Sequence, residues 1–440
     1  MTMRSAIASC VVVLACLSAL AADPLTGPND TGGYRGPHRN GIYPATNLMK
    51  QWPEGGPKLL WKYDKLGPGW STITIAGDTL YVVGGTPGKL FAFTLDGKLK
   101  WAQPYGREFQ KRFDGTRSTV TVAKGIAVVC SGVGAVYGMD ASTGEIRWSV
   151  DTVEVFKQQI PGWGNNITPL VVDDKVIVPI RRGTATMVAL DLQTGKTVWA
   201  NEPSTWAIGN SSPVLVDTGK QRIVVNNLWS AIIGVDPDNG QVIWKIERPG
   251  KCGTTLTPVW AEGKLLVDLD GAMRMFRPTG DDRVFEEIWN APRFHDISQA
   301  VTLAGKVFGL CSVTKQVTTT RQVRGKVETR TEQRKVLSLV ALDAETGKML
   351  HSEPVAKDGS ICAADGMVYL LEGGEGAWQA GQPAKTRISL VKPTAEGFEI
   401  VSRFEPILGT KEAWVNPVPA AGMLILRHGT LIAAYDIAAR

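Results

Sequence analysis

The sequence predicts an all-β fold, an eight-bladed β-propeller of four-stranded antiparallel blades that is closed by an N-terminal strand. Three observations lead to this prediction. The 440 residues include 48 Gly, 25 Pro and 14 Trp, a composition typical of many short strands joined by tight turns. An Asp-x-x-x-Gly turn followed four residues later by Trp recurs along the chain, as expected of a repeat fold. A single strand-like segment near the N-terminus belongs to no repeat.

The repeated turn is clearest in the middle of the chain, where Asp191-Leu-Gln-Thr-Gly195 precedes Trp199. Asp can accept hydrogen bonds from its own turn, and Gly supplies the positive φ that closes it. Two further strand-like runs precede each copy, so each unit has the four short strands of a propeller blade. We expect the repeat Trp side chains to pack between blades. Other copies begin at Asp96, Asp140, Asp236 and Asp343, the last with His351 in the Trp position, and a worn copy leads to Trp289.

Eight units can be counted, with seven as the alternative because units six to eight are degenerate. The last unit stops at Tyr435-Asp436, one strand short, and Leu59–Tyr63 has the pattern of that missing outer strand. Pairing these two ends would close the ring and remove an open sheet edge. The inner strands are expected to begin near Ser71, Ser118, Ile167, Ser211, Leu256, Ile297, Ser360 and Val415.

Residues 1–22 have the pattern of a signal peptide. Arg4 precedes an apolar stretch from Ala6 to Leu20 that is short for a membrane span, and small residues lie near Ala21. A retained anchor, or a lipoprotein modified at Cys16, is the alternative. The sequence therefore predicts export to the periplasm or the cell exterior, with no transmembrane span in the mature chain.

Residues 23–58 are predicted to form a Gly/Pro-rich N-terminal arm, and residues 59–440 the propeller. Thirteen of the 36 arm residues are Gly or Pro, which disfavours regular structure. We expect Tyr34, Tyr43 and Trp52 to attach the arm to the propeller wall.

Cysteine and histidine patterns provide no catalytic or metal motif. Four cysteines remain after Ala22 without a Cys-x-x-Cys pair, which favours buried free thiols, although a disulfide stays possible in an oxidising compartment. The four histidines are widely spaced, and His295-Asp296 alone is weak evidence for an acid/base pair. We therefore assign no catalytic, cofactor-binding or metal-binding residue.

The Ala-Leu-Asp-x-x-Thr-Gly-x-x-x-Trp units resemble the repeats of the pyrroloquinoline-quinone (PQQ)-like family. The segment from Tyr34 to Gly41, Tyr-Arg-Gly-Pro-His-Arg-Asn-Gly, resembles the start of a secreted group of PQQ-like β-propeller proteins. The resemblance implies the propeller fold over essentially the whole mature chain. It also implies two functions, because the repeats occur in quinoprotein alcohol dehydrogenases and in the scaffold lipoprotein of the outer-membrane β-barrel assembly machinery.

Among these functions the sequence favours a binding or scaffold module for a protein or cell-envelope ligand, acting as a monomer without a cofactor. A quinoprotein alcohol dehydrogenase with PQQ and Ca²⁺ is the first alternative. However, the vicinal Cys-Cys pair and the Cys-x-x-Cys-His haem motif of that branch are missing, and no calcium ligands can be assigned. A glycan-binding or glycan-cleaving propeller is the second alternative. Nucleic acid is not an expected partner of an exported protein.

A candidate binding face is predicted from aromatic and amide residues outside the repeat. Several Trp residues lie in the connections just before inner strands, and in a propeller these connections share one face with the central opening. Packing within the loops is the alternative explanation for these Trp residues. The candidate residues are Trp70, Arg117, Trp163, Asn165, Asn166, Trp206, Asn210, His295, Trp414 and Asn416.

A basic hairpin is predicted within blade six, at about residues 314–336. Thr- and Val-rich segments flank Arg324-Gly325-Lys326, which we expect to be a three-residue link. Residues 315–335 contain seven Lys or Arg and two Glu, a net charge of +5, whereas the whole chain has +6. The hairpin is either a solvated extension or a docking arm for an anionic partner, with Arg321, Arg324, Lys326 and Arg330 as candidates. The expected cross-strand pairs are Val323–Val327, Gln322–Glu328, Thr320–Arg330 and Thr318–Glu332.

Overall fold

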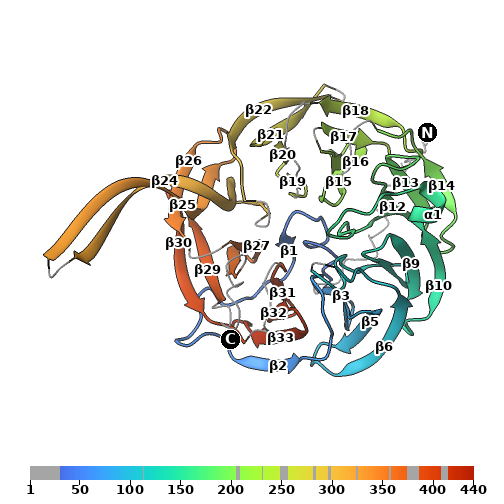
Figure 1. The fold of residues 1–440 in the computed structure, drawn as a ribbon, viewed down its shortest axis with the longest axis horizontal. Helices are drawn as coiled ribbons and strands as arrows, with labels where there is room; N and C mark the ends of the chain where they lie inside the picture. Colours follow the sequence, from blue (N-terminus) through green and yellow to red (C-terminus); the bar gives the residue numbers. More distant parts are fainter. Residues whose placement is uncertain are drawn as a thin grey trace, which may run out of the picture.

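Eight β-sheets form a ring around a central channel (Figure 1). The computed structural model describes residues 30–440, apart from residues 112, 205–208, 230, 248–255, 281–283, 296–298, 324–325, 356–357, 374–385 and 408–414. In each blade four strands follow one another from the channel outward as antiparallel neighbours, and one sheet has a short fifth strand that pairs in parallel with its innermost strand. The eight-bladed propeller is confirmed, and seven blades are excluded.

The first four blades each use four consecutive strands. Blade 1 comprises β3 (Thr74–Ala76), β4 (Thr79–Gly84), β5 (Gly88–Thr94) and β6 (Leu99–Gly106). Blade 2 comprises β7 (Thr121–Ala123), β8 (Ile126–Cys130), β9 (Ala135–Asp140) and β10 (Ile146–Asp151). Blade 3 comprises β11 (Leu170–Val172), β12 (Lys175–Pro179), β13 (Met187–Asp191) and β14 (Thr197–Ala200). Blade 4 comprises β15 (Val214–Asp217), β16 (Arg222–Asn227), β17 (Ala231–Val235) and β18 (Val242–Glu247).

Blades 5 and 6 also use four consecutive strands, whereas blades 7 and 8 include strands from the N-terminal part of the chain. Blade 5 comprises β19 (Val259–Ala261), β20 (Lys264–Leu269), β21 (Ala272–Thr279) and β22 (Val284–Pro292). Blade 6 comprises β23 (Val301–Leu303), β24 (Lys306–Val323), β25 (Lys326–Asp343) and β26 (Met349–Pro354). Blade 7 comprises β27 (Gly359–Ala364), β28 (Met367–Glu372), β29 (Arg387–Thr394), β30 (Gly397–Phe404) and the two-residue β1 (Ile42–Tyr43). Blade 8 comprises β31 (Val418–Ala420), β32 (Met423–His428), β33 (Leu431–Asp436) and β2 (Leu59–Tyr63).

The N-terminal strand closes the ring as predicted. Strand β2 pairs antiparallel with β33, with Leu59 opposite Tyr435 and Tyr63 opposite Ile432. A bulge between Leu59 and Trp61 shifts the register within the pair. The outer edge of blade 8 is therefore covered by a strand that lies about 370 residues earlier in the chain.

The repeat Trp side chains join neighbouring blades, as expected. The indole of Trp148 in blade 2 donates to the Leu192 carbonyl of blade 3 at 2.9 Å, and its ring lies against Gly195 of the same turn. Each such Gly has a positive φ and lacks the β-carbon that would collide with the ring. His351 takes the Trp position in blade 6 and packs against Phe398 at 4.6 Å between ring centroids. The same ring-on-glycine contact occurs for Trp61–Gly97, Trp101–Gly144, Trp199–Gly240, Trp289–Gly347 and His351–Gly397.

The N-terminal arm does not lie along the propeller wall as predicted, except at Trp52, which packs edge-on against Phe404 at 5.2 Å between centroids. It crosses the centre of the ring (Figure 1), where Tyr43 is buried. The reason is that its backbone and its Arg side chains satisfy polar groups on the inner strands. Hydrogen bonds or bridges from the arm reach Ile75, Thr121, Thr168, Pro213, Trp260, Ala300, Ala363 and Ala438, one residue at each of the eight blades.

Two buried arginines of the arm take part in these contacts. Arg39 donates to the carbonyls of Thr168 and Pro213, both at 3.0 Å, and also to that of Pro169. Arg35 donates to the Ala300 carbonyl. Burial lowers the pKa of Arg39 to about 9, so the guanidinium remains a cation at neutral pH. The arm thus links opposite sides of the ring by charge-assisted hydrogen bonds.

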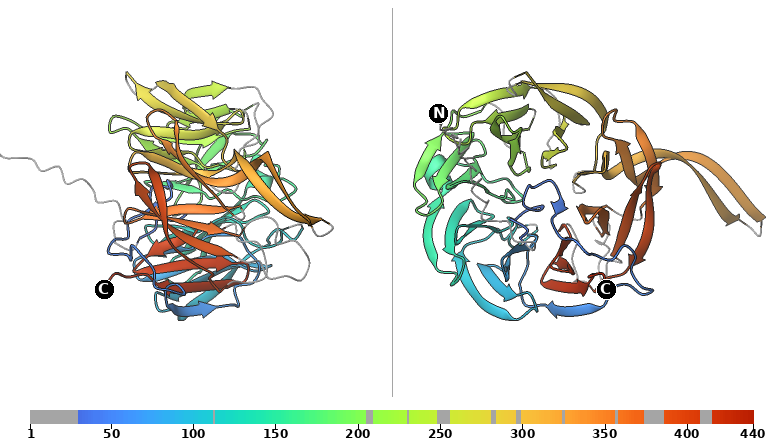
Figure 2. Two further views of the ribbon diagram at one scale, coloured as in Figure 1. Left: turned by 90° about the vertical axis from the view of Figure 1, so that its left-hand side faces the viewer. Right: turned by 180° about the vertical axis from the view of Figure 1, so that it is seen from behind.

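The blade-six hairpin projects from the ring as an extension of the middle strands β24 and β25 (Figures 1 and 2). Its predicted register is wrong by one residue. Val323 pairs with Lys326, so Lys326 belongs to the strand and not to the link; Arg324 and Gly325 lie outside the described residues. The corrected pairs include Gln322–Val327, Thr320–Thr329, Thr319–Arg330 and Thr318–Thr331.

Three of the four cysteines that follow residue 22, Cys130, Cys311 and Cys362, are buried free thiols as expected; Cys252 lies outside the described residues. Burial raises the pKa of the Cys130 thiol to about 12 and that of Cys311 to about 11, so both stay protonated at neutral pH. The described helix α1 (Thr152–Phe156) has five residues. Across the described ranges of the chain, no helix combines the length and the apolar character that crossing a membrane requires.

Candidate functional site

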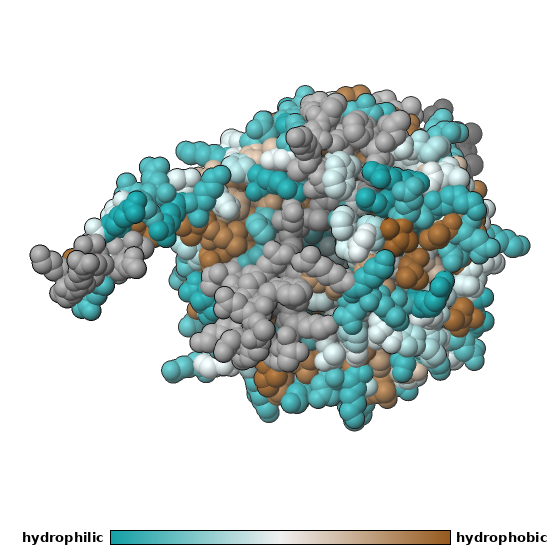
Figure 3. Space-filling view, in the orientation of Figure 1, coloured by the Kyte–Doolittle hydropathy of each residue, from teal (hydrophilic) through white to brown (hydrophobic). Residues whose placement is uncertain are grey.

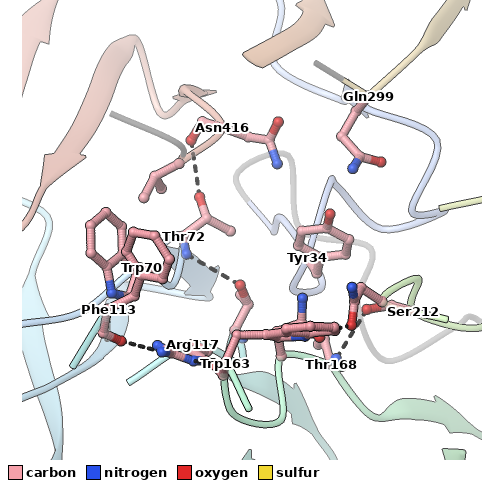
Figure 4. A pocket seen from close by; sticks show the side chains of 14 residues that line it. Tyr34, Trp70, Thr72, Phe113, Arg117, Trp163, Thr168, Ser212, Gln299 and Asn416 are labelled. Atoms are coloured by element: carbon pink, nitrogen blue, oxygen red, sulfur yellow. Dashed lines mark hydrogen bonds between the residues drawn. The ribbon is translucent and has the colours of Figure 1, made fainter. Parts of the chain in front are cut away.

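A cavity of about 290 Å³ opens at one end of the channel, and we call it the mouth cavity. Its walls come mainly from the connections that lead from the outer strand of one blade to the inner strand of the next (Figure 4). Tyr34 of the arm also lines it, so the segment that crosses the channel contributes to the site. The lining residues are Tyr34, Trp70, Thr72, Phe113, Arg117, Thr119, Trp163, Asn166, Thr168, Asn210, Ser212, Gln299, Val415 and Asn416.

A belt of polar side chains surrounds the channel at this level. In seven blades the residue two positions before the inner strand is Thr, Ser, Gln or Asn, and all seven are buried. Blades 1 to 6 are linked in succession because five of these side chains accept, through their oxygen, the backbone N–H of the preceding blade's equivalent residue. The described links are Thr72 N–Thr119 Oγ1 (3.2 Å), Thr119 N–Thr168 Oγ1 (3.1 Å), Thr168 N–Ser212 Oγ (3.0 Å), Ser212 N–Thr257 Oγ1 (3.3 Å) and Thr257 N–Gln299 Oε1 (3.0 Å).

Some hydroxyl groups of the belt keep a proton that they can donate to a ligand in the cavity. Thr119, Thr168 and Ser212 use their oxygens as acceptors in these links, and a hydroxyl retains one donor after accepting one bond. Thr72 is different because its hydroxyl donates to the Asn416 carbonyl at 3.1 Å. Three hydroxyl donors from adjacent blades therefore belong to the cavity lining, and two of them, Thr168 and Ser212, lie close together in Figure 4.

Arg117 holds two aromatic residues of the cavity wall, Phe113 and Trp163, in place; we call them the aromatic wall. Its Nε donates to the Trp163 carbonyl at 2.6 Å, and Nη2 donates to the Phe113 carbonyl. The guanidinium also lies 4.9 Å from the centre of the Phe109 ring, a cation–π distance. Burial lowers the pKa of Arg117 to about 10. Arg117 thus connects two loops and positions Phe113 and Trp163.

Trp163 and Trp70 present different surfaces to the cavity. Trp163 is 40% exposed, and its indole N–H donates to Asn210 Oδ1 at 3.0 Å. Trp70 packs edge-to-face with Phe113 at 6.0 Å between ring centroids and donates to the Asp114 carbonyl at 3.1 Å. The exposed Trp163 ring is therefore a platform on which a flat molecular face can pack.

Asn416 adds an unsatisfied acceptor. Asn416 is only 5% exposed, and its side-chain oxygen Oδ1 has no hydrogen-bond partner among the described residues. A buried amide oxygen without a partner is costly. The Asn416 side chain lines the cavity (Figure 4), but Oδ1 itself is shielded from it, so a donor group of a ligand can satisfy Oδ1 once the amide rotates.

The cavity gathers part of the predicted face. Trp70, Arg117, Trp163, Asn166, Asn210 and Asn416 all line it, whereas two other candidates do not. Asn165 is buried and donates to Cys130 Sγ at 3.0 Å. His295 lies 2.8 Å from Asp358 through Nδ1 instead of facing the cavity. Trp206 and Trp414 lie outside the described residues, as does Asp296.

The prediction missed Tyr34 and the polar belt. The belt had a readable pattern, since a short polar residue recurs before the inner strands, as in Thr119, Thr168 and Ser212. Tyr34 had no such pattern, because its position depends on the path of the arm through the channel.

The basic hairpin is only partly described at its tip. Arg330 is largely exposed and lies 3.4 Å from Glu332, which also pairs with Arg334. Arg324 and the side chains of Arg321 and Lys326 lie outside the described part. The register puts residues 315, 321, 326, 328, 330, 332 and 334 on one face, while the other face carries mainly Thr and Gln. The described part of the hairpin is largely hydrophilic in Figure 3.

The described cavity lining contains one cation, Arg117, and no carboxylate. No group of three or more His, Cys, Asp or Glu that could hold a metal ion occurs among the described residues. Calcium and lanthanide ions are hard cations that require several oxygen ligands, carboxylates among them. The described lining does not fit such an ion, nor a quinone with several carboxylates.

Comparisons with known proteins show two kinds of relative. The BamB outer membrane protein assembly factor of Moranella endobia (strain PCIT) is 29% identical over 218 residues, 47% of this chain and 51% of that protein. The lanthanide-dependent methanol dehydrogenase of Methylorubrum extorquens is 28% identical over 156 residues, 33% of this chain and 25% of that enzyme. The matches thus span about a quarter to a half of these relatives.

A solved structure supports the fold over nearly the whole chain. The quinohemoprotein alcohol dehydrogenase ADHIIG from Pseudomonas putida HK5 superposes with a TM-score of 0.68 over 95% of this chain and 81% of that one, at 14% identity. A family model described as outer membrane protein assembly factor BamB matches residues 53–178 and 96–305. Since these matches together span more than half of the sequence, the chain belongs to the BamB-type family of PQQ-like repeat β-propellers.

Proposed function

We propose that this protein is an exported binding module of the cell envelope that holds a ligand in the mouth cavity and catalyses no reaction. The observation that carries the proposal is the cavity itself, where aromatic, amide and hydroxyl side chains from several blades converge. Its volume of about 290 Å³ lies near the lower end of the ~300–1,000 Å³ typical of small-molecule sites.

Rigidity supports a binding role. The polar belt links neighbouring blades, and Arg39 joins the neighbouring blades 2, 3 and 4 from inside the channel. A site built on such a frame is organised before the ligand arrives, so binding does not have to order it. Export is supported by residues 1–22 and by a relative named as an outer membrane protein assembly factor.

A quinoprotein dehydrogenase is the second candidate because of the identity with the methanol dehydrogenase. Two features of the described lining weigh against it. Arg117, its only cation, already donates to the carbonyls of Trp163 and Phe113, and the lining contains no carboxylate for a metal ion. The proposed module therefore functions without PQQ, Ca²⁺ or a lanthanide.

The experiment uses the mature chain from Asp23 in two assays. The first is reconstitution with PQQ and either Ca²⁺ or a lanthanide, followed by visible absorbance and dye-linked alcohol oxidation. We expect neither stoichiometric PQQ retention nor alcohol-dependent dye reduction. Tight PQQ binding together with turnover would overturn the proposal in favour of the dehydrogenase.

The second assay is a thermal-shift screen with short peptides, saccharides and small organic acids. A ligand that binds only the folded state raises the melting temperature through mass action. We expect hits that are lost in Trp163→Ala and kept in Trp260→Ala. Trp260 is a matched control because it lies outside the cavity lining and donates to the Asp217 carbonyl at 3.1 Å. If no compound binds, or the hits ignore Trp163, the mouth cavity is not the binding site.

A further inference from the structure

The lining also indicates the chemical class of the ligand, an inference that rests on the proposed binding function. We infer that the mouth cavity takes an uncharged saccharide ring. Three features of the described lining favour such a ligand: the hydroxyl donors of the belt, the unsatisfied Asn416 acceptor and the exposed face of Trp163.

The hydrogen-bonding groups require a ligand with several donors and acceptors on a small body. Thr119, Thr168 and Ser212 offer hydroxyl protons in the cavity lining. Asn416 Oδ1, on another blade, needs a donor. A pyranose has hydroxyl groups around its ring, and each can donate and accept at the same time. One sugar ring can therefore meet both demands, whereas a group with acceptors alone leaves Asn416 unsatisfied.

The aromatic platform matches the faces of a sugar ring. A pyranose has one face on which C–H groups predominate, and this face can pack on an exposed indole such as Trp163 without loss of the equatorial hydroxyl bonds. The Trp163 ring is oriented by its hydrogen bond to Asn210 and by the Arg117 contact with its own carbonyl. Trp163 is therefore positioned before a ligand binds.

Charge favours a neutral ligand over an acidic one. The single cation in the described lining, Arg117, directs its hydrogen bonds at backbone carbonyls. An anion in the cavity would lose hydration without gaining a charge-assisted partner. Uronic acids should consequently bind more weakly than the corresponding uncharged sugars.

The size of the cavity disfavours an extended peptide. A peptide bound in the extended form uses the edge of a strand and a series of side-chain pockets. The mouth cavity instead has a volume of about 290 Å³ and a wall of hydrogen-bonded belt residues. One or two sugar rings are the appropriate size.

The test uses saturation-transfer NMR and titration calorimetry on the mature chain. The probes are glucose, galactose, mannose, N-acetylglucosamine and their β-1,4-linked disaccharides, with glucuronate and galacturonate as acidic counterparts. We expect at least one uncharged probe to bind, with a dissociation constant at least tenfold lower than that of its acidic counterpart.

Two variants connect the binding to the cavity. Asn416→Leu should weaken binding at least tenfold while leaving the melting temperature equal or higher, because it removes a buried oxygen that has no partner. Trp163→Ala should also weaken binding at least tenfold, and Trp260→Ala should leave it unchanged. A merely structural role of Asn416 would instead lower the melting temperature.

The outcomes separate this inference from the proposed function. If no uncharged probe binds, while peptides or organic acids bind in a manner that depends on Trp163, the saccharide inference is wrong and the binding module stands. If acidic probes bind as tightly as uncharged ones, the inference is also wrong. If nothing binds in either assay, both fail.

Discussion

The indole of Trp199 in blade 3 lies directly on the α-carbon of Gly240 in blade 4. A β-carbon at Gly240 would be 2.5 Å from Trp199 Cε3, and the indole N–H donates to the Pro237 carbonyl at 3.1 Å. The Gly and the Trp of one repeat unit therefore contact different neighbours. The Gly packs against the Trp of the preceding blade, and the Trp packs on the turn of the following blade. The worn turn at Gly280 has nothing within 4 Å of an added β-carbon, and Trp244, which precedes it, packs on Phe285 instead.

The first prediction follows from this contact. Gly240→Ala should lower the free energy of unfolding by about 2–4 kcal/mol, because the methyl group overlaps the Trp199 ring and the residue keeps a positive φ. Gly263→Ala is the matched control, since Gly263 has φ +71° and no atom within 4 Å of the added carbon. Chemical denaturation should show a loss of only about 1–2 kcal/mol there. Equal losses at the two sites would contradict the role of the Trp contact.

A second prediction concerns the arm. Arg39→Met should destabilise the fold by at least about 2 kcal/mol, because the carbonyls of Thr168 and Pro213 lose their donor inside the channel. Arg277→Met is the control, since Arg277 is exposed and its ion pair with Glu286 is a surface pair worth about 0–1 kcal/mol. Denaturation of both variants measures the difference. A loss at Arg39 no greater than at Arg277 would show that the arm does not stabilise the ring.

A third prediction uses the buried His428. Burial lowers its pKa to about 4, from 6.5, and neither ring nitrogen has a partner among the described residues. The unfolded state therefore binds the proton more readily, so the stabilisation is complete above pH 6.5 and is lost as the pH falls toward 4. Protonation of His428 alone should lower the free energy of unfolding by about 3 kcal/mol between pH 6.5 and 4.

The variant His428→Leu tests this dependence. Its unfolding free energy should fall less than that of the wild type between pH 6.5 and 4.5, whereas His38→Gln, at an exposed position, should keep the wild-type slope. Denaturant titrations at several pH values provide the measurement. An unchanged slope in His428→Leu would mean that His428 does not titrate in this range.

The sequence predicted those features that repeat locally. Turn spacing gave the blade count, and the spare strand Leu59–Tyr63 gave the closure with β33. The path of the arm was not predictable from its Gly and Pro content, because Arg35 and Arg39 find their partners 82 or more residues away. The hairpin register depended on whether Lys326 belongs to the link or to the strand, and Thr-rich strands without an apolar face do not decide this.

The candidate site, too, could be predicted from the sequence only in part. Trp70 and Trp163 could be placed on one face because both precede an inner strand, which is a topological property. The tasks of individual side chains could not be predicted. Arg117 is occupied by backbone carbonyls, and Asn165 turns toward Cys130, because these contacts are set by loop geometry and not by residue type.

The last prediction concerns the hairpin, where the corrected register places seven of the nine charged residues between 315 and 335 on one face. We expect this face to be an electrostatic docking surface for an anionic partner. Residues 315–335 carry a net charge of +5, and the pairs of Glu332 with Arg330 and Arg334 neutralise only part of it. Exposed charges attract over about 10 Å at 0.1 M salt, so retention on an anionic matrix such as dextran sulfate should fall as salt rises.

Replacing four cations together by Gln should abolish this retention without changing the melting temperature: Arg321, Arg324, Lys326 and Arg330. The control replaces four exposed cations of the ring by Gln and should keep the retention: Lys58, Lys98, Lys157 and Arg277. Unfolding of the hairpin variant, or retention that persists in it, would contradict a projecting basic arm.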